Sequence, residues 1–297
     1  MMKQFPRPIL FFASLFAFGA TICSGFAAPC MTLSPETKTH CLQILREALG
    51  VTAEDEFWFG MHAAEALTIA GYGEEVRLAI EPKLKTEKDG QHRCGIAREL
   101  VRAGDREKLS ILLEELSRPD PYAHTHAAES LYKVFEIGDE AIMRKRFTEG
   151  NNIKLRLMAA AALARETKEK SAFVFIREAR DGDDLDGVQI SAWILGAIGD
   201  NQDIEPLHRR LEDVTDPMIR AYLVNALASL GDPEGKKLLT ENLTDEDPAI
   251  RTYAATFATD AKACATQPLL EAMLGDPFLD ARVRAAQTLL QLSNETK

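Results

Sequence analysis

Apolar residues recur along most of this chain at the three- and four-residue spacing that is typical of amphipathic helices. Short apolar runs alternate with longer ones that end in a leucine, and no stretch has the strict alternation of a half-buried strand. Asp-Pro steps, as at 120–121, 216–217 and 247–248, suit a capping residue followed by proline in the first helical turn. Gly-Asp steps, as at 104–105 and 231–232, suit a helix end followed by a new cap. The pattern predicts an all-α protein built from helix pairs.

The longer runs repeat with a spacing of 31 to 33 residues. Each run ends in an anchor residue that follows, by three and four positions, a small or apolar pair such as Ala63-Ala64. In five of the eight runs an arginine lies seven positions before the anchor. The anchors are Leu67, Leu100, Leu131, Leu163, Leu195, Leu227, Ala258 and Leu289. A fixed period over most of the chain predicts an α-solenoid of about eight two-helix repeats, each packed mainly on its neighbours.

The pattern x-Ile-Arg-x-x-Ala-Ala-x-x-Leu, as at 249–255, resembles a HEAT-like repeat of the bacterial short-repeat type. The resemblance covers residues 52–297 and implies a HEAT/armadillo-like solenoid. Residues 28–51 are then an N-terminal segment with a capping helix from Pro35 to Leu49, after Ser34. Solenoids of this type serve as scaffolds, adaptors and enzymes alike, so the resemblance is specific for the fold and not for a function.

Residues 1–27 have the order of regions found in secretory signal peptides. Lys3 and Arg7 precede an apolar run at 9–20, and residues 25–27 are typical of a cleavage site. The apolar run is too short for a membrane span in the mature chain. We therefore expect an exported protein, periplasmic or secreted, with a lipid attached near the cleavage site as an alternative.

Two cysteines lie close together after the predicted cleavage site, at Cys30 and Cys41. In an oxidising compartment they could form a disulfide bridge that fixes the N-terminal segment. The alternative is that the chain carries free buried thiols. No Cys-x-x-Cys spacing indicates a metal or redox site.

The chain is acidic, with a net charge of −11. Removal of residues 1–27, which hold two basic and no acidic residues, takes the charge to −11 − 2 = −13. An acidic surface repels phosphate backbones and anionic lipids. Nucleic acid and membrane surfaces are therefore not expected as partners.

One helix face carries the chemistry that distinguishes the first repeats. Positions nine, five and two before each anchor form a single stripe, opposite the face of the alanine pair. The stripe of the first and third repeats belongs to the near-duplicated motifs HAAEAL and HAAESL. In repeats one to three it holds Trp58, His62 and Glu65, then Gln91, Gly95 and Arg98, then Tyr122, His126 and Glu129.

Side-by-side stacking of these helices places Arg98 between Glu65 and Glu129, where it could bond both carboxylates. Gly95 falls between the two histidines, so no side chain fills the space there. The expected notch, rimmed by the two aromatic residues, suits a small polar ligand. The alternative is purely structural, because glycine also permits close helix packing and a charged column also links helices.

A metal ion is not expected in this notch. Helices two repeats apart lie ~16–20 Å apart when neighbours pack at 8–10 Å, which is too far for one ion to be held by both histidines. The acidic loop at 181–187 lacks the alternation of an EF-hand. HAAEAL is also similar to the repeat helices of deoxyhypusine hydroxylase, a HEAT-like di-iron enzyme with adjacent His-Glu pairs, but no His-Glu dipeptide occurs here. We predict neither a metal nor a cofactor.

Two functions are consistent with these features of the sequence. The first is a non-enzymatic scaffold that binds another protein, and it predicts an exposed apolar patch along several repeats. The second is a binding protein or enzyme for a sugar or carboxylate, which would use the histidines, Arg98 and the glutamates of repeats one to three. The second function predicts a closed pocket confined to those repeats.

Overall fold

The computed structural model describes residues 32–150 and 152–294. Within these ranges the chain forms sixteen α-helices, four short 3₁₀ helices and no β-strand. The all-α solenoid predicted from the sequence is confirmed. One layer consists of α2 (Phe57–Ile69), α4 (Gly90–Arg102), α6 (His124–Lys133), α8 (Ile153–Thr167), α10 (Leu185–Ile198), α12 (Pro217–Ser229), α14 (Pro248–Ala258) and α16 (Leu279–Asn294). The other consists of α1 (Pro35–Leu49), α3 (Gly73–Thr86), α5 (Leu109–Ser117), α7 (Glu140–Glu149), α9 (Lys170–Asp181), α11 (Ile204–Asp213), α13 (Pro233–Asn242) and α15 (Gln267–Met273).

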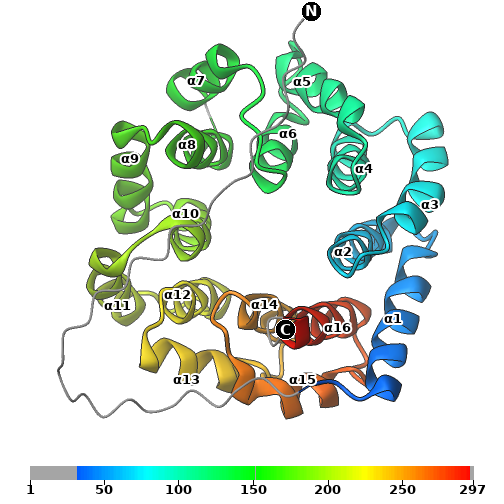
Figure 1. Ribbon diagram of the computed structural model, residues 1–297. Helices are drawn as coiled ribbons and strands as arrows, with labels where there is room; N and C mark the ends of the chain where they lie inside the picture. The colour runs from blue at the N-terminus through cyan, green and yellow to red at the C-terminus, as the bar shows by residue number, and fades with distance from the viewer. Residues whose placement is uncertain (1–31, 151, 295–297) are drawn as a thin grey trace, which may run out of the picture.

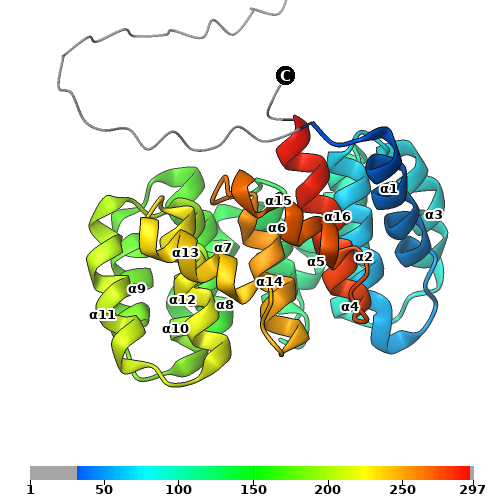
Figure 2. The same ribbon diagram turned by 90° about the horizontal axis from the view of Figure 1, so that it is seen from below.

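The solenoid closes into a ring, as Figure 1 shows. Each even-numbered helix contacts the next one along the inside of the ring, and the last of them, α16, contacts the first, α2. Helix α1 lies against both α2 and α16, so it covers the closing contact from outside. The edge-on view in Figure 2 shows the wall of the ring as helices standing side by side. The repeat pattern did not predict this closure.

The capping signals explain where most helices begin. The Asp216 and Asp247 side chains accept hydrogen bonds from backbone N–H groups of the first turn, and a proline follows each of them. Helix α1 runs over the span expected for it, with the Ser34 hydroxyl accepting from the N–H of Thr37. The Asp120-Pro121 step behaves differently, because Asp120 accepts from the N–H of Tyr122 in a turn and α6 begins only at residue 124.

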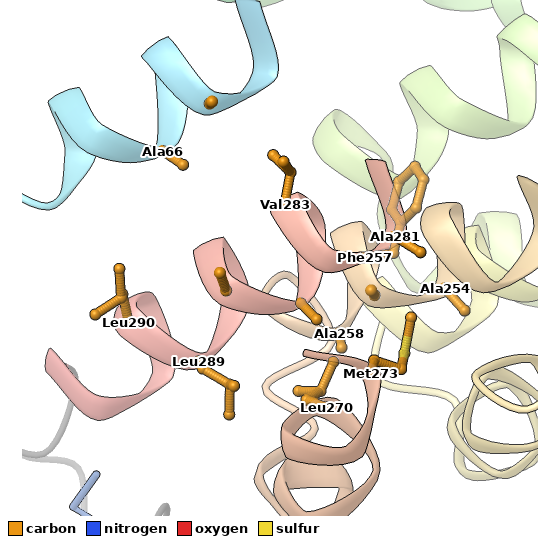
Figure 3. Close-up of a cluster of buried hydrophobic side chains, with 14 of the residues drawn as sticks. Ala66, Ala254, Phe257, Ala258, Leu270, Met273, Ala281, Val283, Leu289 and Leu290 are labelled. Atoms are coloured by element: carbon orange, nitrogen blue, oxygen red, sulfur yellow. The ribbon is translucent and has the colours of Figure 1, made fainter. Parts of the chain in front are cut away.

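The anchors and the alanine pairs form the core of the ring wall. Seven of the eight anchors are fully buried and Leu289 is 1% exposed. Figure 3 shows the last part of this core, where Leu270 and Met273 of α15 lie beside α14 and α16. On the other side of α16, Val283 points toward α2, which carries Ala66. Continuous apolar packing therefore runs across the closing contact.

The repeated arginines stabilise the loops that lead into the inner helices. Arg156 donates to the carbonyl of Phe147, Arg251 donates to the carbonyl of Asp245, and Arg282 donates to the carbonyl of Asp276. Such bonds satisfy carbonyl groups that a helix end leaves without partners. The arginine seven positions before the anchor is thus a structural feature of the repeat.

The predicted disulfide between Cys30 and Cys41 is wrong. Cys41 is a free thiol on α1 with no exposed surface, and burial raises its pKa to about 12. Cys30 lies outside the described residues. The side chain of Cys41 packs within the hydrophobic core cluster.

Candidate functional site: a pocket at the centre of the ring

The inner helices enclose a pocket of about 560 Å³. This volume lies within the range of pockets that bind small molecules. All eight inner helices contribute side chains, and Phe278 does so from the residue before α16. The lining comprises Trp58, His62, Arg98, Thr125, His126, Glu129, Lys133, Lys154, Met158, Ile190, Trp193, Tyr222, Ala249, Thr252, Tyr253, Thr256, Phe257, Phe278, Asp280 and Arg284.

The pocket has a charged side and an apolar side. Helices α16, α2, α4 and α6 bring the charged side chains, together with two imidazoles. Helices α8, α10, α12 and α14 bring mostly aliphatic and aromatic groups, and Lys154 is the one charged side chain among them. The apolar wall consists of Met158, Ile190, Trp193, Tyr222, Tyr253 and Phe257.

The sequence-predicted stripe lies largely on this pocket. Trp58, His62, Arg98, His126 and Glu129 line it, whereas the other four residues of the stripe, Glu65, Gln91, Gly95 and Tyr122, do not. Tyr122 is 55% exposed, and its hydroxyl donates to Asp89 at 2.7 Å. Glu65 lies beside the lining, and Gly95 lies behind it.

The open notch predicted above Gly95 is wrong. A Cβ atom at Gly95 would lie 2.9 Å from the ring of Trp58, so this ring already occupies the space that glycine leaves. The same ring stacks on the imidazole of His126, with centroids 5.1 Å apart and planes 14° apart. Gly95 therefore makes room for Trp58, and the ligand space lies further in, at the centre of the ring.

The predicted column of Glu65, Arg98 and Glu129 forms different ion pairs. The Nε of Arg98 donates to Glu99 at 2.5 Å, and both side chains are buried. Lys133 pairs with Glu129 at 2.7 Å. Both glutamates of the column thus have other partners, although Arg98 lies close enough to influence their titration.

Glu65 is held by two arginines, Arg102 of α4 and Arg284 of α16, each at 3.0 Å. Burial alone would raise the pKa of Glu65, but the two guanidinium groups hold it well below its usual range. Burial likewise opposes ionisation of Glu129, and Lys133 with Arg98 lowers its pKa to about 2. Both carboxylates are therefore charged at neutral pH.

His62 of α2 and Asp280 of α16 form a second polar contact where the ring closes, in addition to that of Glu65 with Arg284. The Nδ1 of His62 lies 2.8 Å from a carboxylate oxygen of Asp280. Burial and the nearby Arg284 lower the pKa of His62, and the histidine in turn lowers the pKa of Asp280 against the effect of burial. Burial also lowers the pKa of His126. Both imidazoles are therefore neutral at pH 7, and the carboxylate is ionised.

Sequence reasoning missed Asp280, Arg284 and the apolar wall. All of them except Phe257 occupy the same stripe positions in later repeats, so they carry the signal that identified the first repeats. Asp280 lies nine positions before its anchor and Arg284 lies five before it, as Trp58 and His62 do. Only closure of the ring turns the stripes of all repeats toward one space.

The donor set does not fit a metal centre. Within residues 32–150 and 152–294, no group of three or more histidine, cysteine, aspartate or glutamate side chains could hold an ion. His62 and Asp280 form a pair without a third ligand, and His126 stacks on Trp58. The di-iron chemistry that the resemblance of the HAAEAL motif suggests has no matching ligands in this pocket.

Fold and site together define a closed α-solenoid with a central pocket. Residues 178–259 match the family model for HEAT repeats, so this part of the chain consists of HEAT repeats, and the same helix-pair fold continues on both sides of it. Human deoxyhypusine hydroxylase in complex with glycerol is similar at 14% identity and a TM-score of 0.41, over 88% of this chain and 98% of that one. An engineered protein is similar at 15% identity and a TM-score of 0.28, over 86% and 96%. No curated protein matches the chain.

Proposed function

We propose that this protein binds a small amphiphilic molecule in the pocket at the centre of its ring. The observation that carries the proposal is the division of the pocket into a charged side and an apolar side. A ligand with a polar head and an apolar body would contact both sides at once. The size of the pocket and the mixture of apolar walls with a few polar groups are typical of ligand sites.

The hydrogen-bond donors of the pocket favour an anionic head group. Four cationic side chains line the pocket, and two of them, Lys133 and Lys154, pair with Glu129 and Asp186. The guanidinium groups of Arg98 and Arg284 are held from behind by Glu99 and Glu65, and each keeps further N–H groups. A carboxylate could receive hydrogen bonds from them.

The scaffold function has less support. An open solenoid offers its long concave face to a partner protein, but here that face is turned inward around the pocket. The large apolar side chains that are exposed lie on separate elements, as Leu78 on α3, Val174 on α9 and Leu185 on α10 do. Single exposed apolar residues of this kind are ordinary on protein surfaces.

Tryptophan fluorescence tests the proposal without a label, because both tryptophans of the chain, Trp58 and Trp193, line the pocket. We expect a panel of apolar carboxylates, such as 3-phenylpropionate and octanoate, to include ligands that change the emission saturably. Ile190→Phe, which fills the apolar wall, should raise the Kd of such a ligand at least roughly tenfold. The matched control is Leu78→Phe, at a residue 74% exposed on the outer helix α3. Equal affinities of the two variants, or no saturable response to the whole panel, would remove the proposal.

We also propose that the protein is exported. The order of basic, apolar and small residues at positions 1–27 supports this proposal. None of the described helices is long and apolar enough to cross a membrane. Expression in a Gram-negative host should give a mature protein that begins near residue 28 in the periplasmic or culture fraction. Full-length chain in the cytoplasmic fraction alone, read by intact mass, would contradict the proposal.

A further inference from the structure

On the charged side of the pocket, the hydrogen bond between His62 and Asp280 determines which nitrogen of the imidazole can accept from a ligand. Asp280 is ionised and can only accept, so the proton between it and His62 belongs to Nδ1 of the imidazole. The imidazole is neutral, and its other nitrogen, Nε2, therefore carries a lone pair. His62 lines the pocket, so this nitrogen is the one left for a ligand.

Cationic donors line the same side of the pocket as this acceptor. Arg284 follows Asp280 by one helical turn, and its charge acts on His62 strongly enough to lower the pKa of the imidazole. Its Nη1 donates to Glu65 at 3.0 Å and to Gln287 at 2.7 Å. These bonds orient the guanidinium group and leave its other N–H groups for a ligand. Arg98 is oriented in the same way by Glu99. The charged side of the pocket thus presents the Nε2 acceptor of His62 together with two oriented guanidinium groups.

We propose that the ligand is a 2-hydroxycarboxylate with an aliphatic or aromatic body, whose hydroxyl group donates to Nε2 of His62 while its carboxylate accepts from Arg284 and Arg98. This inference rests on the proposed ligand-binding function. The adjacent hydroxyl and carboxylate match an acceptor that lies on the same side of the pocket as cationic donors. The body lies against the apolar wall, where Trp193 and Tyr222 offer ring surfaces.

The hydroxyl group decides the affinity because Nε2 of His62 is partly buried. The His62 side chain is 22% exposed and that of Asp280 is 9% exposed. A ligand without the hydroxyl group would cover this nitrogen and leave it without a donor, which costs more than the bond itself contributes. A ligand with a carboxamide in place of the carboxylate would lose the charge-assisted bonds to the arginines.

Two matched pairs of compounds test the inference on the wild-type protein by tryptophan fluorescence and calorimetry. They are 3-phenyllactate with 3-phenylpropionate, and 2-hydroxyoctanoate with octanoate. In at least one pair we expect the hydroxy acid to bind at least roughly tenfold tighter. We also expect 3-phenyllactamide to bind at least roughly tenfold more weakly than 3-phenyllactate.

Two substitutions test whether the preference for the hydroxy acid comes from Nε2 of His62. His62→Phe removes the acceptor, so the two members of each pair should bind with the same Kd. Asp280→Asn no longer fixes the tautomer, and the preference for the hydroxy acid should shrink. Met158→Leu, a change of similar volume on the apolar wall, is the control and should affect both members of a pair equally.

The outcomes separate this inference from the proposed function. If both members of each pair bind the wild-type protein equally, or if the amide binds as well as the acid, the hydroxycarboxylate is excluded while ligand binding stands. If the preference survives in a folded His62→Phe variant, Nε2 is not the acceptor and the inference is wrong. If no small amphiphile changes the tryptophan emission, the proposed function itself fails.

Discussion

Replacing Glu65 with alanine should lower the free energy of unfolding by about 3 kcal/mol or more. Glu65 is the carboxylate between Arg102 and Arg284, and its removal takes one carboxylate partner from each guanidinium group. Arg284 then keeps only the neutral Gln287, whereas Arg102 keeps Glu99. One of these arginines is on α16, so the substitution also weakens the contact that closes the ring. A largely buried charge without its partner destabilises a protein far more than the loss of an exposed pair does.

Urea denaturation of the wild-type and Glu65→Ala proteins measures this effect. The matched control is Glu140→Ala, which removes the exposed ion pair with Arg144 on α7 and should change stability by about 0.5 kcal/mol or less. Small-angle scattering below the denaturation midpoint provides a second readout, because an opened ring has a larger radius of gyration. Equal midpoints for Glu65→Ala and Glu140→Ala would show that the central ion pairs do not hold the ring together.

Replacing Gly235 with alanine should destabilise the protein by about 1–3 kcal/mol. The added Cβ atom would lie 2.5 Å from the Cβ atom of Leu227 and 2.6 Å from the backbone nitrogen of Ala228. Leu227 is an anchor of the inner layer, and the backbone of α12 cannot move away without disturbing its contacts with α10 and α14. Only a shift of α13 relieves the contact, and this shift opens the core between the two layers.

Thermal unfolding followed by circular dichroism tests this effect against Gly275→Ala. Gly275 also lies beside a helix end, but an added Cβ atom there would find its nearest neighbour, the carbonyl oxygen of Ala272, at an ordinary 3.6 Å. The control should unfold within a degree or two of the wild-type protein, since surface changes rarely exceed about 0.5 kcal/mol. A Gly235→Ala midpoint as high as that of Gly275→Ala would mean that α12 and α13 can separate enough to admit the added Cβ atom without loss of stability.

Sequence periodicity predicted the repeat fold well, because the signals that define each repeat are local. An anchor such as Leu163, its alanine pair and its arginine all act within one helix or on the loop before it. Caps such as Asp216 depend only on the next three residues. Local rules of this kind do not depend on the rest of the chain, so they hold within any single window of the sequence.

Ring closure could not be predicted in the same way, because it depends on a small rotation between successive repeats that adds up over the whole solenoid. The partners it brings together, His62 with Asp280 and Glu65 with Arg284, are 218 and 219 residues apart. The candidate site was therefore predicted only in part. The stripe positions were correctly expected to share a face, but the contacts of Trp58 above Gly95 and of Arg98 with Glu99 depend on side-chain conformations that spacing does not determine.

The closed seam between α16 and α2 also constrains how this chain can change over evolutionary time. In an open solenoid, duplication or loss of a helix pair alters only the length, because the added unit contacts its neighbours and the far end is unaffected. In a ring, one more or one fewer unit would require every other interface to adopt a new angle. Otherwise α16 would no longer contact α2. We therefore expect descendants of this protein to keep their number of repeats while the side chains facing the centre diversify, so that new ligand specificities arise by substitution and not by gain of repeats.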